Sequence, residues 1–407
     1  MTILYIHQYF KTPKEGGAIR SYYLAKGLVD KGFKVIMITA HNQKEYVHTY
    51  VDGIEVHYLP IYYANHLGFL ARIKAFLTFA YKAIRLSRRI KGVDLSYVMT
   101  TPLTTGIIAL WLKKFRKIPF YFEVGDLWPT APVQMGSIKN PLLKRLLYAF
   151  ESKLYKEAKK NIALSPAIQS YIEEKAPGKQ VGMIPNISDT DFFQRSAKKE
   201  VLENKYDVKD QFVVTYLGAA GRANHLEYIL EVAEACLKQG LKIKFMIAAE
   251  GSEEKRLQHI ILERGITNVD FRPFTDKEGV KELMNITDAV FISYANVPVL
   301  QTGSPNKFFD GLAAGKIIIV NFEGWIKEVI EGANCGFYTD CLKPASFPEQ
   351  ISQYVFNDIL RKTSQKNSRL VAEEFFAKSK LVDQLANEIL PTPQTERSLP
   401  VRKAVNQ

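Results

Sequence analysis

The alternation of short apolar runs with longer amphipathic ones constrains the fold of this chain more than any other feature. The first apolar run, Ile3–Ile6, has the length of a strand, and a helical pattern follows it from about residue 18 to residue 30. Further runs of strand length lie at residues 34–39, 54–58, 95–99, 119–123, 161–164 and 182–184, and a second helical pattern occupies residues 104–115. Strands that alternate with helices at these spacings predict βαβ units and a doubly wound parallel sheet.

The same alternation restarts after a polar stretch at residues 185–191. The runs of this second series lie at residues 212–218, 244–248, 269–272, 289–293 and 317–321, and a long amphipathic segment, 348–390, follows them. A chain of 407 residues is too long for one ordinary domain, but it suits two domains of about 200 residues that each bury a full core. The sequence therefore predicts the α/β class with two doubly wound Rossmann-like domains.

Composition excludes several classes of protein. Hydrophobic residues make up 47% of the chain and charged residues 24%, which is typical of a folded globular protein. No run of about 18 uncharged apolar residues occurs, and because a strand pattern begins at residue 3 we expect no signal peptide. Three widely spaced cysteines, Cys236, Cys335 and Cys341, favour a reducing compartment, and the histidines form no cluster of metal-ligand spacing. We therefore expect a cytoplasmic protein without a metal site.

A loop that opens onto a helix, Gln301–Gly315, carries the strongest signal for a ligand. We expect Ser304 to cap this helix, because its hydroxyl can accept a bond from an unpaired amide, and Pro305 to occupy the first helical position. Lys307 then lies in the first turn, where the helix end is already partly positive, so both would attract an anion. Asp310 lies one turn further on the same face, within reach of a hydroxyl that the anion carries. A phosphate attached to a ribose fits both demands. The alternative is an ordinary capped helix with a solvated lysine.

The place of this run in the predicted sheet favours the ligand. The run lies between the apolar runs at 289–293 and 317–321, hence at the carboxyl end of a strand, where open parallel sheets bind their ligands. It resembles the donor-site helix of the GT-B-fold retaining glycosyltransferases of family 4. In that family two glutamates eight residues apart bracket the start of this helix. Asp310 matches the second and is implied to hold the ribose, whereas Thr302 stands in place of the first.

The resemblance extends over about residues 1–385. The run SPNKFFD, residues 304–310, resembles the fucosaminyltransferase-like subset of the family, which acts in capsule and O-antigen synthesis. The run IPNISDTDFF, residues 184–193, is similar to the family's junction between domains. The resemblance implies the GT-B architecture, in which two Rossmann-like domains face each other across a cleft and the last helix crosses back to the first domain. We therefore expect domains at 1–187 and 188–375, followed by a returning helix and a disordered tail at 376–407.

Two further loops are expected to contact the donor. Gly16 and Gly17 lie between a strand and a helix, where paired glycines leave amides free, although a plain turn would use the same residues. The resemblance places the donor's phosphate and sugar against this loop. Arg222 ends a loop after the strand at 212–218, where a guanidinium can bind two oxygens of a diphosphate. The predicted donor site comprises Gly16, Gly17, Arg222, Thr302, Gly303, Ser304, Asn306, Lys307 and Asp310.

The run Glu123–Pro129 follows the end of another strand and resembles the subset's motif E-V-x-D-L-W-P. The resemblance implies that Asp126 faces the reacting centre, so we expect this catalytic residue to contact the acceptor or to orient its nucleophilic hydroxyl. An acid at the carboxyl end of a parallel strand is well placed for that role. The alternative is that Asp126 caps a helix. We expect Glu123 to be a structural partner of Arg20.

The net charge of +13 is distributed unevenly. Residues 1–190 contain 27 Lys and Arg against 13 Asp and Glu, whereas the rest of the chain contains 28 against 29. Residues 64–92 contain seven cations and no acid, and residues 139–160 contain seven more. The first segment has a helical apolar face formed by Phe69, Ile73, Phe76, Leu77, Ala80 and Ile84. Basic amphipathic helices are typical of anionic membrane surfaces. The alternatives are core-packed helices with solvated cations and a nucleic-acid partner, for which the sequence contains no recognised module.

Together these features predict a retaining glycosyltransferase. It would move a sugar from a nucleotide diphosphate donor to a polyprenyl-diphosphate-linked saccharide at the inner face of the membrane, with a UDP-sugar preferred over a GDP-sugar. Because Arg222 and Lys307 would neutralise the diphosphate, no metal or other cofactor is expected. Nucleic acid is not expected as a partner. The alternatives are a nucleotide-sugar epimerase on the same scaffold and a peripheral membrane scaffold without catalysis.

Overall fold

The structure, a computed structural model, describes residues 1–390 except residues 14, 16–18 and 65–66. The described chain forms two compact units. Unit 1 consists of residues 1–185, 302–304 and 379–390, and unit 2 consists of residues 186–301 and 305–378. Gly16, Gly17 and the tail after residue 390, which the sequence predictions name, lie outside the described residues.

Unit 1 is built on an eight-stranded sheet with the order β3-β4-β2-β1-β5-β6-β7-β8. Its strands are β1 (Thr2–Ile6), β2 (Lys34–His41), β3 (Val47–Val51), β4 (Ile54–Pro60), β5 (Leu95–Met99), β6 (Phe120–Val124), β7 (Lys160–Ala163) and β8 (Val181–Met183). All neighbours run parallel except β3 and β4, which form an antiparallel hairpin. The central strands are apolar and buried along nearly their whole length, as a sheet covered on both faces requires.

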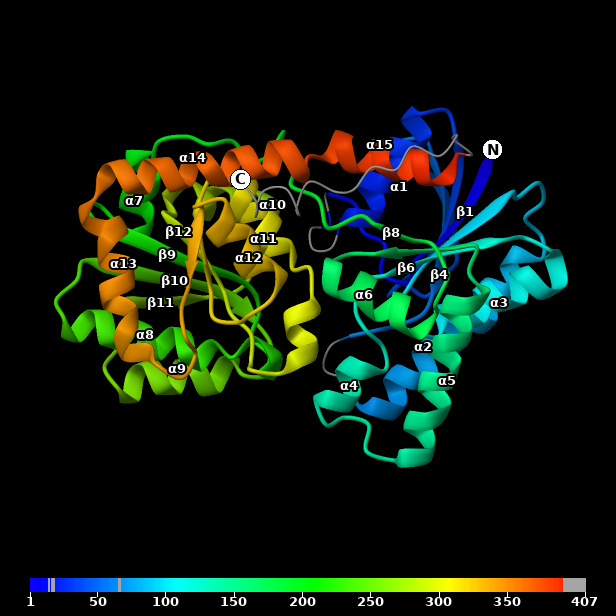
Figure 1. Ribbon diagram of the computed structural model, residues 1–407, viewed down its shortest axis with the longest axis horizontal. Helices are drawn as coiled ribbons and strands as arrows, with labels where there is room; N and C mark the ends of the chain where they lie inside the picture. The colour runs from blue at the N-terminus through cyan, green and yellow to red at the C-terminus, as the bar shows by residue number, and fades with distance from the viewer. Residues whose placement is uncertain (14, 16–18, 65–66, 391–407) are drawn as a thin grey trace. The chain divides into compact units, whose positions relative to one another are not determined.

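The helices that connect these strands cover both faces of the sheet (Figure 1). They are α1 (Arg20–Asp30), α2 (Phe69–Ser87), α3 (Thr105–Arg116), α4 (Thr130–Gln134), α5 (Pro141–Glu157) and α6 (Pro166–Lys175). Because βαβ crossovers are right-handed, α1, which leads from β1 to β2, lies on one face. The helices α2, α3, α5 and α6 lead in the opposite direction along the sheet and therefore lie on the other face.

The last described helix, α15 (Lys378–Ile389), packs on unit 1 beside α1 (Figure 1). The two helices approach closely at Gly27, where a Cβ would lie 2.4 Å from the Val382 side chain, so this position requires glycine. Glu388 of α15 forms an ion pair with Lys160 at the start of β7. The two ends of the described chain thus lie in unit 1, and unit 2 is formed from the residues between them apart from 302–304.

Unit 2 is built on a six-stranded parallel sheet with the order β11-β10-β9-β12-β13-β14. Its strands are β9 (Phe212–Ala219), β10 (Ile243–Glu250), β11 (Val269–Arg272), β12 (Ala289–Ile292), β13 (Ile317–Val320) and β14 (Gly336–Tyr338). The direction of winding reverses between β9 and β12. Sheets of this kind bind ligands beyond the carboxyl ends of the strands at such a reversal.

The helices of unit 2 position the loops at that edge. They are α7 (Glu200–Tyr206), α8 (Leu226–Lys238), α9 (Glu254–Glu263), α10 (Lys277–Ile286), α11 (Asn306–Ala313), α12 (Trp325–Gly332), α13 (Phe347–Phe356) and α14 (Asp358–Phe375), with short 3-10 helices η1 (Arg222–Asn224), η2 (Pro298–Thr302) and η3 (Pro344–Ser346). The apolar face of α11 anchors it, because Phe308 and Phe309 are fully buried. The ring centroids of Phe309 and Phe376 of the core are 5.1 Å apart.

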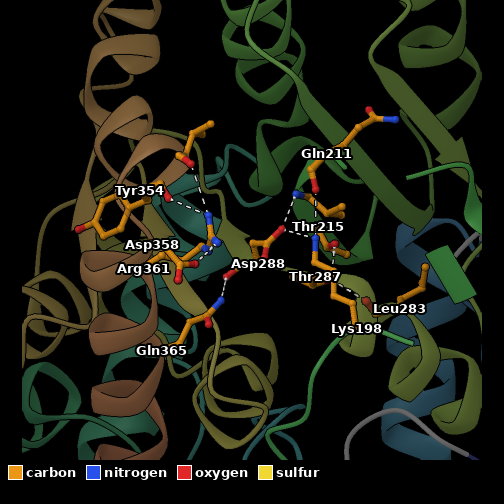
Figure 2. Close-up of polar contacts among 12 residues, drawn as sticks. Lys198, Gln211, Thr215, Leu283, Thr287, Asp288, Tyr354, Asp358, Arg361 and Gln365 are labelled. Atoms are coloured by element: carbon orange, nitrogen blue, oxygen red, sulfur yellow. Dashed lines mark hydrogen bonds and ion pairs between the residues drawn. The ribbon is translucent and has the colours of Figure 1, made fainter. Parts of the chain in front are cut away.

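A polar network holds the amino-terminal edge of the same sheet (Figure 2). Asp288, which directly precedes β12, accepts bonds through Oδ2 from Lys198 Nζ at 2.5 Å and from the Val213 amide at 2.8 Å. Gln365 of α14 donates to the Asp288 carbonyl at 3.3 Å. The network joins β9, β12 and α14 at the edge opposite to the one at which a ligand is expected.

The predicted α/β fold class is confirmed, but the sequence prediction misses the edge strands β3 and β14. Residues 47–51 alternate between exposed and half-buried side chains, as an edge strand with one open face does, so they form no continuous apolar run. The segment expected to be one amphipathic stretch, 348–390, divides into α13, α14 and α15. Asn357 ends the first of these helices and caps the second, since its Oδ1 accepts from the Leu360 amide at 3.0 Å.

Candidate active site

The start of α11 forms the centre of the predicted donor site in unit 2. The helix begins at Asn306 with Pro305 at its N-cap position, and no side chain caps it. The prediction that Ser304 caps the helix is therefore wrong. Pro305 has an extended backbone instead of a helical one, so the helix begins one residue later than expected and Ser304 precedes the cap. The amides of the first turn, including that of Lys307, have no acceptor within the helix.

The ammonium of Lys307 lies against the carboxyl end of β9. Its Nζ donates to the Tyr216 hydroxyl at 2.9 Å and lies 4.1 Å from the centroid of that ring, with the Tyr294 ring 6.0 Å away. Gly218 makes room for it, because a Cβ there would lie 3.2 Å from Nζ. Burial lowers the pKa of Lys307 to about 7. Aromatic rings supply no full counter-charge, so a bound anion would raise this pKa again.

Asp310 lies one turn after Lys307 on the same helix. Burial raises the pKa of Asp310 to about 7, while the Lys277 ammonium opposes this shift and the Asp189 carboxylate adds to it. Asp189 is itself paired with Lys277, at 2.8 Å. Lys307 and Asp310 thus occupy successive turns of α11 but have different neighbours. A carboxyl group with a pKa near neutrality can both accept a hydrogen bond and donate one, which suits the hydroxyls of a ribose.

Arg222 begins η1, three residues after β9 ends at Ala219. Its side chain is 87% exposed, and its Nε lies 3.7 Å from Glu253 Oε1, an ion pair too long to fix the guanidinium. The backbone of the same loop is held more firmly, because the Ser293 hydroxyl at the end of β12 donates to the His225 carbonyl at 3.1 Å. Arg222 therefore combines a fixed backbone with a free side chain at the point where the sheet reverses.

Sequence reasoning missed His225 in this loop. His225 has a left-handed backbone with φ of 46°, which is uncommon for a residue other than glycine. Its Nδ1 is buried and has no hydrogen-bond partner among the described residues, while its ring stacks on Tyr228. An unpaired imidazole nitrogen three residues from Arg222 is a further candidate for contact with an anion. The only signal in the sequence is a polar residue in a loop after a buried strand.

Thr302, Gly303 and Ser304 group with unit 1, whereas the residues on either side of them group with unit 2. The Ser165 hydroxyl donates to the Thr302 carbonyl at 2.6 Å. This bond uses the backbone of Thr302 and therefore assigns no role to its side chain.

Asp126 follows β6 at the carboxyl edge of the sheet of unit 1. Its side chain is exposed, and the Thr101 hydroxyl donates to its Oδ2 at 3.4 Å. Thr101 has φ of 77°, a strained conformation for a β-branched residue that is found mainly at functional sites. The alternative that Asp126 caps α4 does not hold, because that helix has Pro129 at its N-cap position and no side-chain cap.

The expected pairing of Glu123 with Arg20 is confirmed. Arg20 Nε lies 3.0 Å from Glu123 Oε1, and the Tyr97 hydroxyl donates to Oε2 of the same carboxylate. Arg20 also donates to the Ile184 carbonyl at 2.8 Å. All these groups are buried, so the network fixes the start of α1 relative to the end of β6, three residues before Asp126.

The spacing of the histidines in the sequence did not reveal that His48 and His57 lie together in the fold. The β3–β4 hairpin pairs these two residues across its strands, and Glu55 lies on the same face. The spacing of nine residues between the histidines hides their proximity. Only the register of the hairpin brings them together, and the register could not be predicted while β3 itself was missed.

The apolar face predicted for α2 is only partly correct. Phe76 and Ala80 are buried in the core, but Leu77 is 49% exposed. Leu70 and Tyr81 are also exposed, at 79% and 65%. They lie on the same side of the helix as Leu77, because seven residues and four residues separate them. A buried apolar face and an exposed one thus occur on the same helix.

The second basic segment, α5, also exposes apolar side chains at its start. Leu142 and Leu146 are exposed there, close in sequence to the exposed cations Lys139 and Arg145. Within the described residues, every helix is too short or too polar to cross a lipid bilayer. The side chain of Phe69, which the sequence prediction placed on the apolar face of α2, lies outside the described set.

Comparison with known proteins identifies two domain families. The family model of the Glycosyl transferase 4-like domain matches residues 15–186. The family model of Glycosyl transferases group 1 matches residues 198–371. WcaI of Escherichia coli K12, named as a glycosyl transferase of colanic acid biosynthesis, is 24% identical over 266 residues, or 62% of each chain. The alpha-D-kanosaminyltransferase of Streptomyces kanamyceticus is 19% identical over 193 residues, 47% of this chain and 48% of that one. The chain thus spans less than two thirds of the length of these relatives.

Solved structures of low sequence identity share the fold. Sucrose-phosphate synthase from Thermosynechococcus elongatus has a TM-score of 0.77 at 14% identity, over 95% of this chain and 98% of that one. HepE of Anabaena in complex with UDP-glucose has a TM-score of 0.69 at 17% identity, over 96% and 99%. WaaG, a glycosyltransferase involved in lipopolysaccharide biosynthesis, has a TM-score of 0.69 at 15% identity over the same shares. At these identities the likeness concerns the fold.

Proposed function

The chain belongs to the GT-B-fold glycosyltransferases of family 4, and on this premise we propose that it acts in the synthesis of a surface polysaccharide. It would transfer a sugar, with retention of configuration, from a nucleotide diphosphate donor to a lipid-linked saccharide. The donor would bind unit 2 at the reversal of the sheet. A UDP-sugar is the preferred donor, a choice supported by the complex of HepE with UDP-glucose.

The observation that carries this proposal is the ammonium of Lys307, half-buried among tyrosines at the start of a helix. A diphosphate bound there would meet Lys307, the unpaired amides of the first turn and, from the next loop, the exposed guanidinium of Arg222. Asp310, one turn further, would bind the ribose. These groups would stabilise the charge that develops on the leaving diphosphate, so we propose no metal for the transfer step.

The reaction would proceed on one face of the donor sugar. The bond between the anomeric carbon and the diphosphate oxygen breaks while the acceptor oxygen forms its bond from the same side, which retains the configuration. The proton of the acceptor hydroxyl passes to the departing diphosphate oxygen. Asp126, oriented by the hydroxyl of Thr101, would bind the acceptor and direct its nucleophilic hydroxyl.

The exposed face of α2 supports an acceptor that resides in a membrane. Leu70, Leu77 and Tyr81 form an apolar strip there, and the exposed cations Lys74 and Arg85 lie on the same side of the helix. Apolar side chains interleaved with cations suit the boundary between acyl chains and anionic head groups. We therefore propose a polyprenyl-diphosphate-linked saccharide as the acceptor and the inner face of the cell membrane as the site of action.

The test of the donor site is the variant Lys307→Ala. Its affinity for UDP should fall about 10- to 150-fold, because a charge-assisted hydrogen bond contributes about 1.5–3 kcal/mol. Its melting temperature should stay the same or rise slightly, since a buried cation leaves the positive end of a helix. Calorimetric titration and thermal unfolding measure the two effects.

A matched control is Lys327→Ala, which removes another half-buried lysine of unit 2 that lies 4.2 Å from a tyrosine ring. This variant should bind UDP normally. If Lys307→Ala unfolds the protein while UDP binding persists, Lys307 is structural. A screen of UDP- and GDP-sugars for nucleotide release then distinguishes the activities: transfer or hydrolysis releases UDP, an epimerase converts the sugar nucleotide without release, and a scaffold turns over neither.

A further inference from the structure

The β3–β4 hairpin of unit 1 gathers three side chains that commonly bind metal ions. Asp52 and Gly53 connect the strands with positive φ values of 49° and 84°, the backbone of a tight hairpin turn, and this turn fixes the register. In that register His48 lies directly opposite His57. Glu55 precedes His57 by two residues and therefore projects from the same face of the sheet.

The ligand atoms are close enough to share one ion. Glu55 Oε1 lies 3.3 Å from His48 Nε2 and 3.3 Å from His57 Nε2, and all three atoms lie within 4.8 Å of one another. Ligands of a tetrahedral Zn²⁺ lie about 3.3–3.5 Å apart, given metal–ligand distances of about 2.0–2.2 Å. The two imidazoles stack with centroids 4.3 Å apart. The ring of His48, 44% exposed, has the freedom to tilt so that both nitrogens face one ion.

The second observation concerns His57 Nε2, which has no hydrogen-bond partner in the described structure although it is buried. The side chain of His57 is 7% exposed, and the carboxylate oxygen 3.3 Å away lies outside hydrogen-bonding geometry. An unpaired buried nitrogen is costly, and a metal ion would satisfy it.

The neighbours of the three residues match the outer shell of a metal site. The Tyr46 hydroxyl lies 2.6 Å from Nδ1 of His57, so that Nδ1–H can donate to the tyrosine oxygen while Nε2 offers its lone pair. Lys34 Nζ lies 3.3 Å from Glu55 Oε2, which leaves Oε1 as the single ligand oxygen. The Lys34 cation opposes metal binding by its charge but orients the carboxylate.

We propose that His48, Glu55 and His57 bind one Zn²⁺ or a similar divalent ion that prefers imidazole, with water as the fourth ligand. Two nitrogens and one oxygen suit such ions, whereas Mg²⁺ and Ca²⁺ prefer oxygen ligands. The ion joins β3 to β4 and thereby holds the edge strand of the sheet, which pairs with no strand other than β4 in the described structure. This role is structural and separate from sugar transfer.

The experiment uses the whole chain without an affinity tag, after treatment with a chelator. Calorimetric titration with Zn²⁺ should show one saturable site, and Co²⁺ should give the visible absorption of a tetrahedral complex. Zn²⁺ should raise the melting temperature, because an ion that binds the folded state stabilises it. His48→Gln should abolish all three signals, and Tyr46→Phe should weaken Zn²⁺ binding about 10- to 100-fold.

A matched control is His259→Gln, which changes an exposed histidine of unit 2 that lies 3.8 Å from Glu263 but has no third ligand among the residues that the structure describes. This variant should keep the full Zn²⁺ response. The proposal is overturned if the wild type shows no saturable site, or if His48→Gln binds Zn²⁺ as the wild type does. If His48→Gln melts at a lower temperature than the wild type in the absence of metal, Glu55→Gln serves as a second variant that lacks one ligand. Unchanged Zn²⁺ affinity in Glu55→Gln would equally refute the site.

Discussion

Lys307 and Asp310 lie one helical turn apart, and burial moves the pKa of each to about 7 from opposite directions. In both cases the charged form is the disfavoured one, so near neutral pH the ligand-free site carries less charge than the sequence suggests. A diphosphate would favour the ammonium form of Lys307. Binding of the donor should therefore change the protonation of the protein, which links affinity to pH.

The first prediction is that UDP binding takes up a proton at Lys307. At pH 8 a lysine with a pKa of about 7 is mostly neutral, so a bound diphosphate that restores a pKa near 10 would draw about 0.9 proton from the buffer. UDP affinity should consequently fall as pH rises from 7 to 10. Calorimetric titrations at pH 8 in two buffers of different ionisation enthalpy measure the uptake.

The lowered pKa of Lys307 makes the folded state more stable as pH rises, whereas it makes UDP binding weaker. Between pH 7 and about 10.5 the unfolded chain holds a proton on Lys307 that the folded chain has lost, so the contribution of this residue to stability rises with pH through that window. In Lys307→Met both effects should disappear. Equal proton uptake in the wild type and in the variant would assign the uptake to another group.

The second prediction concerns Asp126→Asn, which keeps the size of the side chain and removes its charge. Sugar transfer should fall far more than UDP affinity, because Asp126 is assigned to the acceptor. The fold should be unaffected, since the side chain is exposed and its one described bond comes from Thr101. Steady-state kinetics and UDP titration separate the two quantities. A parallel loss in both would move Asp126 to the donor site, and no loss in either would remove it from the site.

Among the structural elements, the amino-terminal edge of the sheet in unit 2 depends on one carboxylate. Asp288 joins Lys198, Val213 and, through its carbonyl, Gln365 (Figure 2). We predict that Asp288→Asn lowers the free energy of unfolding by about 1–3 kcal/mol, because Lys198 would lose its charged partner in a half-buried place. Denaturant unfolding measures the change.

The control for this prediction is Asp358→Asn at the start of α14, also drawn in Figure 2. Asp358 is exposed and paired with Arg361 and Lys362, and such surface pairs contribute at most about 1 kcal/mol. An equal effect of the two substitutions would mean that burial of the Asp288 network adds nothing to stability.

The elements that the sequence predicted well are those that are buried on both faces. The central strands of both sheets, such as β1 and β12, are buried on both faces, so each shows a continuous apolar run, as in Ile3–Ile6. The edge strand β3 was missed because one of its faces is open. The start of α11 was misplaced by one residue, since Ser304 followed by Pro305 satisfies the rules for a cap and a first helical residue, and only the extended backbone of Pro305 shows otherwise.

Site residues were likewise predicted where the order of elements along the chain was sufficient, and missed where packing between distant residues decides. The sequence predicted the Arg20–Glu123 pair and the place of Lys307 next to a strand end, because the alternation of elements determines which loops share an edge. It could not predict that Tyr216 receives the Lys307 ammonium, which depends on packing across the sheet. The His48–His57 pair depends on hairpin register, which no local pattern specifies.

At the scale of the whole molecule, charge divides along the chain. The basic surplus lies in residues 1–190, whereas the rest is close to neutral. On α2 some cations have structural bonds: Arg72 donates to the Leu67 carbonyl and Lys82 to the Pro60 carbonyl. The exposed cations Lys74, Arg85 and Arg89 are therefore the better candidates for contact with lipid.

The last prediction follows from these exposed cations. Changing Lys74, Arg85 and Arg89 to Gln should reduce binding to anionic vesicles about 100-fold, at about 1 kcal/mol for each cation. Binding of the wild type should weaken with added salt, since charges are screened over about 8 Å at physiological ionic strength. Donor hydrolysis should persist in the variant. Vesicle sedimentation and UDP release measure the two properties.

The control removes the same charge from unit 2, by changing the exposed residues Lys238, Lys255 and Lys366 to Gln. Vesicle binding of this variant should match that of the wild type. If both triple variants lose vesicle binding to the same extent, net charge and not the face of α2 governs attraction to lipid. If neither salt nor mutation matters, the acceptor should be sought in solution.

The return of the chain to unit 1 in α15 has a consequence for the order of synthesis. Unit 1 begins with β1 but lacks the helix that covers α1 until residue 389 has been made, whereas unit 2 is complete by residue 378. On the ribosome the domain that starts first therefore finishes last. A chimaera that exchanges donor domains must accordingly be made as an insertion that keeps α15, with Val382 against Gly27, in the parent of unit 1.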